Sequence, residues 1–502
     1  MIAASTSSGI PTLASIFAGL GAELPVPGLA VRGLAIDSRQ ITGGECFFAL
    51  RGARENGLSF VAQAIQNGAV AVGIDSAEQS PVVPVPVIRV PRLREKLGMV
   101  AAKFYGEPSA KLRVIAVTGT NGKTTVAHLC AQALTTLGQH CGYLGTLGTG
   151  DLNSLQPSGL TTPDPIRLQA DFATLLADGK VAVALEASSH ALAQFRLAGT
   201  QITTAVFTGL SHDHLDYHAS PQAYFEAKRS LFAQPGLRHA VLSADDSRAS
   251  EIADVLPSEI SLTTFSLQNK THPRAREMRL VLSHAEYTPQ HSLLEIDTPQ
   301  GRASIRSRLV GDINAQNLLA ALGVLLSFEV PLAAAATALA QAMPVCGRLE
   351  RHGGSAGMPL IFIDYAHSPD SLERVLRILR GFKPARLICI FGCGGERDRA
   401  KRPLMGQVAA EYADLTIVTT DNPRNEQPAS IAREIMAGVN DTSCCTAIAD
   451  RAQAIETALA DAAPGDIVLI AGKGHETTQE IAGQRFAQSD QAIVQKWLAG
   501  RR

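Results

Sequence analysis

The sequence predicts an α/β protein of three domains, with parallel sheets in its central and C-terminal parts. The chain has 502 residues, of which 46% are hydrophobic, and this length suggests roughly three domains with ample cores. From about residue 93 onward, short runs of consecutive apolar residues alternate with stretches that are compatible with helices. Such runs are typical of parallel strands that helices cover on both faces.

The N-terminal domain is expected to span residues 1–92 and to be a small α/β unit. It holds short β-rich runs, and Pro- and Val-rich sequence at 81–88 indicates a loop that leads into a strand. The predicted strands are Gly33–Ile36, Cys46–Leu50, Val70–Ile74 and Pro86–Val90.

The central domain is expected at residues 93–345. The stretch from about 260 to 308 alternates polar and apolar residues, so it is expected to be more antiparallel in character. The alanine-rich stretch 330–343 is predicted to be a short, packed helix. The predicted strands are Leu112–Thr118, Val181–Ala187, Thr204–Thr208 and Ala240–Ser243.

The C-terminal domain is expected at residues 346–502, where a second alternating α/β series begins. Each of its apolar runs ends in polar or glycine-rich sequence. In open α/β sheets, ligands bind at these carboxyl ends of the strands. The predicted strands are Leu360–Asp364, Leu387–Phe391, Leu415–Thr419 and Ile467–Ala471.

The composition excludes several classes of partner. A net charge of −1 and an aromatic content of 5% provide no basic or base-stacking surface, so nucleic acid is not expected as a partner. No apolar run reaches the ~18 residues that span a bilayer, and no signal peptide is indicated, so membrane insertion is not expected. The eight cysteines are scattered along the chain, which favours a reducing cytoplasm over a disulfide framework.

A phosphate-binding loop is predicted at Gly119–Thr125, which directly follows a predicted strand and precedes a predicted helix at 126–137. In such loops, backbone N–H groups and the helix N-terminus face an anion; here Lys123 adds a point charge and Thr124 can hold Mg²⁺. The usual spacing would place a glycine at Val117, so the loop is a variant. A glycine turn with an incidental lysine is the alternative, and the flanking strand and helix disfavour it.

Polar residues follow two other predicted strands of the central domain. Glu186 stands at the end of the strand 181–187, where its carboxylate can coordinate Mg²⁺ opposite Thr124, while the following serines can cap a helix. Three His and two Asp lie within 212–218, which indicates either a metal or proton-transfer site or a solvated loop. The metallohydrolase pattern H-x-H-x-D-H fails there because residue 217 is tyrosine.

Lys228 lies in an unusual position for a charged residue. The predicted helix 221–232 places it within an apolar stripe that includes Tyr224 and Phe225. Such a lysine either snorkels to solvent or is functional, and the pattern by itself favours snorkelling. A buried, neutral lysine amine can react with CO₂ to form a carbamate, which acts toward Mg²⁺ like a carboxylate.

Four polar turns follow predicted strands of the C-terminal domain. They contain Asp364, Arg397, Asp421–Arg424 and Gly472–Glu476. Because all four follow strands of one sheet, they can converge on one rim. Their mixture of Arg, Asn, Lys and Glu suits a zwitterionic small molecule.

Together these residues resemble those of the Mur ligase family, the ATP-dependent enzymes that add amino acids to the peptidoglycan precursor. The resemblance covers essentially the whole chain. Within the family, the chain resembles the type that adds diaminopimelate. Two sequences carry this resemblance, Asp421-Asn422-Pro423-Arg424 and Gly472-Lys473-Gly474-His475-Glu476. It implies a UDP-MurNAc-binding N-terminal domain, a central P-loop ATPase sheet and a C-terminal Rossmann-like domain for the amino acid.

The resemblance also implies roles for individual residues. The catalytic residues would be Lys123, Lys228 and His214. The ATP-binding residues would be Gly119, Thr120, Asn121, Gly122, Lys123, Thr124, Thr125, Asn314, Asn317, Arg348 and Asp364. The UDP-MurNAc-dipeptide would contact Ser38, Thr161, Thr162, Ser188, Gln194 and Arg196, and diaminopimelate would contact Arg397, Asp421, Asn422, Pro423, Arg424, Gly472 and Glu476. The Mg²⁺ ligands would be Thr124, Glu186, His214 and Lys228, the last as a CO₂-derived carbamate.

The implied reaction uses ATP and Mg²⁺ to activate the carboxylate of UDP-MurNAc-L-Ala-D-Glu as an acyl-phosphate and to join it to meso-diaminopimelate. A cytoplasmic monomer is expected, with a role in peptidoglycan synthesis and therefore in cell shape and division. The alternatives are the same reaction with L-lysine and a nucleotide-switch ATPase of another class. Arg424 favours diaminopimelate, because a guanidinium pairs with the distal carboxylate that lysine lacks. Gly209 and His212 stand where the family often has Asn and Arg.

Overall fold

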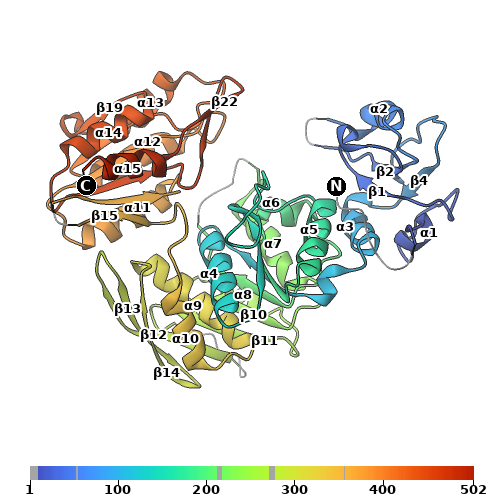
Figure 1. Cartoon of the computed structure of the whole chain (residues 1–502), viewed down its shortest axis with the longest axis horizontal. Helices are drawn as coiled ribbons and strands as arrows, with labels where there is room; N and C mark the ends of the chain where they lie inside the picture. The colour runs from blue at the N-terminus through green and yellow to red at the C-terminus, as the bar shows by residue number, and fades with distance from the viewer. Residues whose placement is uncertain (1–8, 53–54, 212–216, 271–276, 356, 502) are drawn as a thin grey trace.

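The computed structural model describes residues 9–52, 55–211, 217–270, 277–355 and 357–501. Three sheets of four, ten and six strands follow one another along the chain, with a two-stranded hairpin near its end. Figure 1 shows three bodies in a row, coloured blue, cyan to yellow, and orange to red. The predicted α/β class with three domains is confirmed.

The N-terminal sheet has four parallel strands in the order β1-β2-β3-β4. All four predicted strands are present, with small shifts at their ends. The elements are α1 (Leu13–Ile16), β1 (Gly33–Ala35), β2 (Glu45–Phe48), α2 (Val61–Gln66), β3 (Ala71–Asp75), β4 (Val87–Val90) and α3 (Leu93–Phe104), with 3₁₀ turns at Ser38–Gln40 and Gly57–Phe60.

The central sheet has ten strands in the order β14-β13-β12-β11-β10-β9-β5-β8-β6-β7. Neighbours from β12 to β6 in this order are parallel, and the pairs at both ends are antiparallel. The strands are β5 (Arg113–Thr118), β6 (Cys141–Gly145), β7 (Gly148–Gly150), β8 (Ala182–Glu186), β9 (Thr204–Phe207), β10 (His239–Ser243), β11 (Ser261–Ser266), β12 (Glu277–Tyr287), β13 (Ser292–Thr298) and β14 (Gly301–Ser307).

The antiparallel character predicted for residues 260–308 is confirmed for the pairs β12–β13 and β13–β14 but is wrong for β11. This strand pairs in parallel with both β10 and β12. It is buried over nearly its whole length, from Leu262 to Ser266. Burial on both faces is the usual environment of a parallel strand, and it outweighs the local alternation.

Helices cover both faces of the central sheet, because successive strand residues face opposite cores. In β5, Ile115 and Val117 pack in one core with α4, α9 and α10, whereas Val114 and Ala116 pack in the other with α5 to α8. The helix predicted after the phosphate loop and the one predicted at 330–343 are both present. The helices are α4 (Lys123–Thr136), α5 (Pro165–Ala177), α6 (Ser189–Ala193), α7 (Pro221–Arg229), α8 (Arg248–Ala253), α9 (Asp312–Ser327) and α10 (Leu332–Gln341), with 3₁₀ turns at Pro108–Lys111 and Ser230–Ala233.

The C-terminal sheet has the order β15-β16-β20-β17-β18-β19, in which only the edge strand β15 runs antiparallel to its neighbour. The four predicted strands are present, whereas the short β15 and β19 and the hairpin β21–β22 are additional. The elements are β15 (Glu350–Gly353), β16 (Leu360–Asp364), α11 (Pro369–Gly381), β17 (Leu387–Phe391), α12 (Lys401–Tyr412), β18 (Leu415–Val418), α13 (Pro428–Met436), β19 (Cys445–Ala447), α14 (Arg451–Asp461), β20 (Ile467–Ala471), β21 (Thr478–Ile481), β22 (Gln484–Ala487) and α15 (Asp490–Ala499), with a 3₁₀ turn at Thr442–Cys444.

Among the residues that the structure describes, no helix is both long and apolar enough to cross a membrane.

Helix α3 joins the N-terminal and central domains through a backbone contact. A Cβ added at Gly98 would lie 1.9 Å from the carbonyl oxygen of Ala198. A Cβ at Gly199, where φ is +76°, would lie 2.6 Å from the carbonyl oxygen of Gly98. The two glycines therefore allow α3 to rest directly on the turn that follows Arg196.

We expect Gly98→Ala to lower the free energy of unfolding by about 1–3 kcal/mol, because the added methyl group cannot fit without backbone movement. Chemical denaturation of the purified protein measures this change. Gly381→Ala is the matched control, because Gly381 also lies in a helix but has no neighbour within 4 Å of an added Cβ. Equal stability of the two variants would contradict the proposed backbone contact.

Candidate active site

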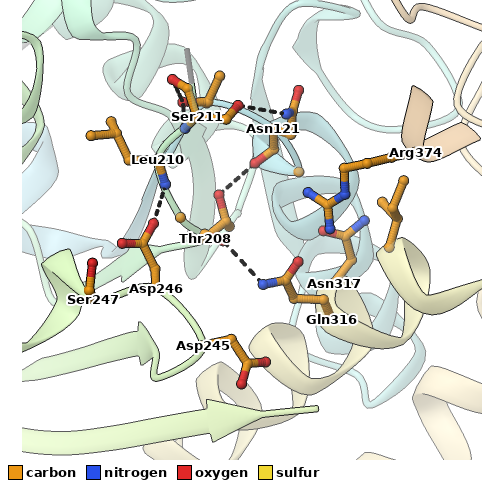
Figure 2. Close-up of a pocket in the computed structure, with 14 residues that line it drawn as sticks. Asn121, Thr208, Leu210, Ser211, Asp245, Asp246, Ser247, Gln316, Asn317 and Arg374 are labelled. Atoms are coloured by element: carbon orange, nitrogen blue, oxygen red, sulfur yellow. Dashed lines mark hydrogen bonds between the residues drawn. The ribbon is translucent and has the colours of Figure 1, made fainter. Parts of the chain in front are cut away.

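The carboxyl ends of five adjacent parallel strands meet at one edge of the central sheet. In the sheet order β10-β9-β5-β8-β6, the predicted phosphate loop follows β5 and the predicted metal residue Glu186 ends β8. A cavity of about 380 Å³ lies at this edge, and Figure 2 shows the residues that line it. Its lining comprises Thr120, Asn121, Gly122, Thr208, Gly209, Leu210, Ser211, Asp245, Asp246, Ser247, Ile313, Gln316, Asn317 and Arg374.

The phosphate loop is tightly packed against the end of β9. A Cβ at Gly119 would lie 1.9 Å from Thr208 Oγ1, and one at Gly122 would lie 2.5 Å from Asn317 Oδ1. Thr208 Oγ1 donates a hydrogen bond of 2.5 Å to the carbonyl oxygen of Asn121, as Figure 2 shows. Glycine is therefore required at both positions, and Thr208 holds the loop in its curved form.

The positive groups of the loop lie where an anion would bind. Helix α4 begins at Lys123, so its unpaired N–H groups and positive dipole end are directed at the loop. The ammonium group of Lys123 donates to the carbonyl oxygens of Gly119 and Thr120 at 2.9 and 2.8 Å. These bonds keep the lysine over the loop, and the arrangement suits a phosphate chain.

Glu186 is the buried acidic group of the site. Its Oε2 accepts a hydrogen bond from Thr124 Oγ1 at 2.9 Å, and its Oε1 accepts one from Tyr143 Oη at 2.5 Å. Thr146 donates to the same carboxylate through its backbone N–H, at 2.9 Å, and its hydroxyl, at 3.1 Å. Burial and the neighbouring carboxylate raise the pKa of Tyr143, so the phenol remains a donor.

The donor set at Glu186 fits Mg²⁺, because the ion prefers hard oxygen ligands and Thr124 supplies a hydroxyl next to the carboxylate. The predicted third ligand, His214, lies in the segment 212–216, outside the described residues. Within the described part of the chain, no group of three or more His, Cys, Asp or Glu side chains has the geometry of a metal site.

Lys228 does not snorkel to solvent. Its side chain on α7 is 1% exposed, and its Nζ donates to the carbonyl oxygen of Gly119 at 2.7 Å. The same nitrogen lies 4.5 Å from the centre of the Tyr224 ring. The structure therefore places the Lys228 amine against the backbone of the phosphate loop at Gly119. The prediction from the helical pattern that Lys228 snorkels to solvent is wrong.

The residues predicted on the adenosine side are divided between two positions. Asn317 on α9 lines the cavity together with Gln316 and with Arg374 of the C-terminal domain (Figure 2). Asn314 lies behind them, where its amide donates to the carbonyl oxygen of Val310 at 3.0 Å and its Oδ1 accepts from Asn317 at 3.3 Å. Asn314 thus supports Asn317 in this arrangement.

The linker 343–349 between the central and C-terminal domains is attached at both ends. Gln132 on α4 holds Met343 by two hydrogen bonds, from Nε2 to the carbonyl oxygen at 3.0 Å and from the backbone N–H to Oε1 at 2.8 Å. Arg348 donates to Thr124 Oγ1 at 3.2 Å, and its guanidinium stacks over the Tyr365 ring at 4.4 Å. The linker therefore reaches the phosphate loop directly.

Asp364 secures the end of this linker. Its Oδ2 accepts from the N–H of Leu349 at 2.6 Å, and its Oδ1 accepts from the N–H of Ala366 at 2.7 Å. Burial raises the pKa of Asp364, although Arg348 opposes the shift.

Most of the predicted UDP-MurNAc-dipeptide residues form one cluster beside Glu186. Thr162 Oγ1 donates to the carbonyl oxygen of Glu186 at 2.7 Å and lies 3.2 Å from Ser188 Oγ. Arg196 donates to the carbonyl oxygen of Thr162 and to Gln194 Oε1, both at 2.7 Å. Burial lowers the pKa of Arg196.

The other two predicted dipeptide residues, Thr161 and Ser38, lie at different distances from this cluster. Thr161 Oγ1 lies 3.1 Å from the Thr146 hydroxyl, which connects it to the Glu186 side of the cluster. Ser38 lies apart in the N-terminal domain, where its hydroxyl donates to Gln63 Oε1 at 2.7 Å.

The predicted amino-acid residues meet at the carboxyl ends of β18 and β20. Asn422 Nδ2 donates to Glu476 Oε2 at 2.8 Å. Arg424, at φ +52°, donates from Nη1 to the carbonyl oxygen of Gly395 at 2.5 Å and lies 3.8 Å from the Glu480 carboxylate. A Cβ at Gly394 would touch both Arg424 and Arg397, at 3.1 and 3.6 Å, so the two arginines flank one glycine turn. Pro423 lies between Asn422 and Arg424, so it belongs to the same loop.

Asp421 and Gly472 also meet in this region. A Cβ at Gly472, where φ is +108°, would lie 2.8 Å from Asp421 Oδ2. Asp421 Oδ1 accepts from the N–H of Asn422 at 2.6 Å. The three predicted turns of the amino-acid site, with Arg397, 421–424 and 472–476, therefore share one rim.

Several contributors to the site were not predicted from the sequence. Tyr143 and Thr146 come from β6 and the loop after it, and β6 was absent from the predicted strands. Thr208 was assigned to the end of a strand without a role. Lys473 belongs to the motif 472–476 without an assigned role, although a lysine between two glycines at a strand end is a recognisable signal.

Comparisons with known proteins agree along the whole chain. The model described as "Mur ligase family, catalytic domain" matches residues 30–105, "Mur ligase middle domain" matches 117–325, and "Mur ligase, glutamate ligase domain" matches 347–474. A protein of Pseudomonas aeruginosa named UDP-N-acetylmuramoyl-L-alanyl-D-glutamate–2,6-diaminopimelate ligase is 44% identical over 473 residues, which cover 94% of this chain and 96% of that protein. A protein of Chromobacterium violaceum with the same name is 42% identical over 478 residues, covering 94% and 95%.

Solved structures show the same fold. A structure entitled UDP-N-acetylmuramoyl-L-alanyl-D-glutamate–2,6-diaminopimelate ligase superimposes with a TM-score of 0.71 at 34% identity, covering 98% of this chain and 99% of that one. MurF from Acinetobacter baumannii superimposes with a TM-score of 0.65 at 18% identity, covering 97% and 98%. The second likeness concerns the fold alone.

We expect Gly119→Ala to abolish detectable nucleotide binding, because the new Cβ would displace Thr208 and with it the phosphate loop. Equilibrium binding of a fluorescent ATP analogue measures the effect. Gly138→Ala is the control, because Gly138 also has a positive φ, of +79°, but an added Cβ there meets nothing within 4 Å. Unaltered binding by Gly119→Ala would show that the loop does not carry the nucleotide.

Proposed function

The chain belongs to the Mur ligase family, and we propose that it is an ATP-dependent ligase that adds meso-2,6-diaminopimelate to UDP-MurNAc-L-Ala-D-Glu in peptidoglycan precursor synthesis. Curated relatives with 42–44% identity over 94% of the chain bear the name of this enzyme. The phosphate loop, the Thr124–Glu186 pair and the rim of the C-terminal sheet supply the three sites that such a reaction needs.

The observation that carries the choice of amino acid is the environment of Arg424. Its side chain is 21% exposed, one of its amino groups donates to the carbonyl oxygen of Gly395, and its nearest carboxylate, on Glu480, is 3.8 Å away. A guanidinium has five N–H donors, so donors remain for the distal carboxylate of diaminopimelate. L-Lysine as a substrate has no distal carboxylate, so the guanidinium of Arg424 would have no substrate group to pair with.

In the first step, the substrate carboxylate attacks the γ-phosphate of ATP, and ADP leaves. Lys123 and the N-terminus of α4 stabilise the charge that moves onto the phosphate oxygens. Bound Mg²⁺ would neutralise part of the repulsion between the carboxylate and the triphosphate, and Thr124 and Glu186 are the described residues that would hold it. Arg348 reaches Thr124 from the C-terminal domain and so faces the same anions.

In the second step, an amino group of diaminopimelate attacks the acyl-phosphate, and an amide and inorganic phosphate form. The acyl-phosphate must be shielded from water, so the C-terminal domain has to close over the central edge. The UDP-MurNAc-dipeptide is proposed to lie along the cluster of Thr161, Thr162, Ser188, Gln194 and Arg196, with its uridine end toward Ser38. The direct contact of Thr162 with Glu186 supports this placement.

The remaining features are also proposals. The proposed boundaries at 92/93 and 345/346 each fall between two sheets, whose strands lie at 33–90, 113–307 and 350–471, although α3 packs in the N-terminal core. Monomeric state and cytoplasmic location stay predictions from the sequence. A carbamate on Lys228 is supported by the burial of this amine at the phosphate loop, where a second oxygen-rich group would face Mg²⁺.

We expect phosphate release from ATP with UDP-MurNAc-L-Ala-D-Glu and meso-diaminopimelate, and none with L-lysine. Arg424→Ala should lower kcat/KM for diaminopimelate by about 100-fold, the loss of roughly 3 kcal/mol of charged hydrogen bonding, with the KM for ATP unchanged. Arg433→Ala, an exposed arginine on α13, is the control. Release with lysine would keep the ligase but refute this role of Arg424; release with neither amino acid would refute the proposed substrate.

We expect protein equilibrated with ¹³C-bicarbonate to give a carbamate carbonyl signal in ¹³C NMR spectra, and Lys228→Ala to lose both this signal and ligase activity. Lys111→Ala, at an exposed position, should keep both. A small added carboxylate should partly restore the activity of Lys228→Ala. Identical spectra for the native protein and Lys228→Ala would exclude the carbamate.

A further inference from the structure

A fully buried lysine lies beneath the amino-acid site. Lys473 is the second residue after β20 and has an exposed fraction of 0%. Its neighbours Gly472 and Gly474 have φ values of +108° and +52°, and an added Cβ at either would come within 2.8 Å of Asp421 or Tyr365. The two glycines therefore allow a tight turn in the buried stretch 471–474, and the lysine side chain lies inside the domain.

Lys473 fixes the orientation of the Asn422 side chain. Its ammonium group lies 3.2 Å from Asn422 Oδ1, which also accepts a hydrogen bond of 3.0 Å from the N–H of Glu480. Because an ammonium has donors and no acceptor, the oxygen of the amide must face it. The amide nitrogen of Asn422 is thereby turned toward Glu476, to which it donates at 2.8 Å.

The same lysine determines which oxygen of Glu476 remains available. Glu476 Oε2 accepts from Lys473 Nζ at 2.7 Å and from Asn422 Nδ2 at 2.8 Å. Oε1 accepts no hydrogen bond from any residue that the structure describes, and the Glu476 side chain is 30% exposed. One carboxylate oxygen is thus held by Lys473 and Asn422, and the other is left for a further donor.

The charges around the lysine make this arrangement stable before substrate arrives. A buried ammonium group is costly unless it is paired, and Glu476 provides the ion pair at 2.7 Å. Asp421 is the next carboxylate of the rim and is itself 9% exposed. Arg451 lies on the far side of the same region, where its guanidinium is paired with Asp490 at 2.7 Å and so does not compete for Glu476.

We propose that Lys473 is a positioning residue of the amino-acid site, which holds Glu476 and Asn422 so that Glu476 Oε1 accepts the distal ammonium group of the substrate. Lys473 lies beneath both residues and acts through them rather than by touching the substrate. This inference rests on the proposed function, because it takes diaminopimelate as the amino acid. Glu476 would then bind the distal ammonium group of diaminopimelate, and Arg424 would bind its distal carboxylate.

The first test is Lys473→Met, which keeps the length of the side chain and removes its charge and donors. We expect the KM for diaminopimelate to rise at least about 10-fold, while the KM values for ATP and UDP-MurNAc-L-Ala-D-Glu change less than about twofold. Lys496→Met, at an exposed lysine of α15, is the matched control and should behave as the native protein. An unchanged KM for diaminopimelate, or equal changes for all three substrates, would overturn the proposal.

The second test is a double-mutant cycle with Glu476→Gln, a nearly isosteric change. If Lys473 acts through Glu476, the effects of the two substitutions on the KM for diaminopimelate will not add, and the double variant will resemble Glu476→Gln. Glu476→Gln alone leaves the buried ammonium without its ion pair, so its melting temperature should fall by several degrees and recover when Lys473→Met is added. This recovery can be measured even if Lys473→Met folds poorly.

Additive effects in the cycle, or a melting temperature of Glu476→Gln equal to that of the native protein, would refute the pairing. Failure of this inference can be distinguished from failure of the proposed function. If the native protein released no phosphate with diaminopimelate, the substrate assignment would fail first, whereas the melting temperatures would still report whether Lys473 is held by Glu476.

Discussion

The buried carboxylate of Glu186 ties together most of the loops on which the reaction depends. Its two side-chain oxygens receive hydrogen bonds from Thr124 and from Tyr143 and Thr146, which belong to α4, β6 and the loop after β6. Its backbone oxygen receives one from Thr162, which in turn is held by Arg196. The residues proposed to bind the nucleotide, the metal and the muramoyl dipeptide are therefore all hydrogen-bonded, directly or through one neighbour, to Glu186.

In two sheets of this chain, loops at the carboxyl ends of parallel strands bring the site residues together. In the central domain, the loops after β10, β9 and β5 line one cavity, and in the C-terminal domain the turns after β17, β18 and β20 bring together the residues proposed to bind the amino acid. Parallel strands bring residues that are far apart in the sequence to one line. Arg348 connects the two edges, because it leaves the second domain and ends at Thr124 of the first.

The parts of the site that the sequence predicts are those with local signals. The loop at 119–125, Glu186 at a strand end and the residues at 421–424 each follow an apolar run and can be recognised without knowledge of the strand order. The roles of Tyr143 and Thr208 depend on β6 lying next to β8 and on β9 lying next to β5, which no local pattern encodes. The burial of Lys228 against Gly119 likewise depends on how α7 packs, and a helical stripe alone does not specify it.

The anchored linker has a consequence for the order of events in catalysis. Because Gln132 holds Met343 to the helix that starts at the phosphate loop, rotation of the C-terminal domain has to take place within the few residues between Met343 and Arg348. Arg348 at the end of this short pivot contacts Thr124, the residue that a nucleotide and its metal would engage. Nucleotide occupancy and the position of the amino-acid rim are thus mechanically linked, so we expect an ordered sequence in which ATP enters before the amino acid.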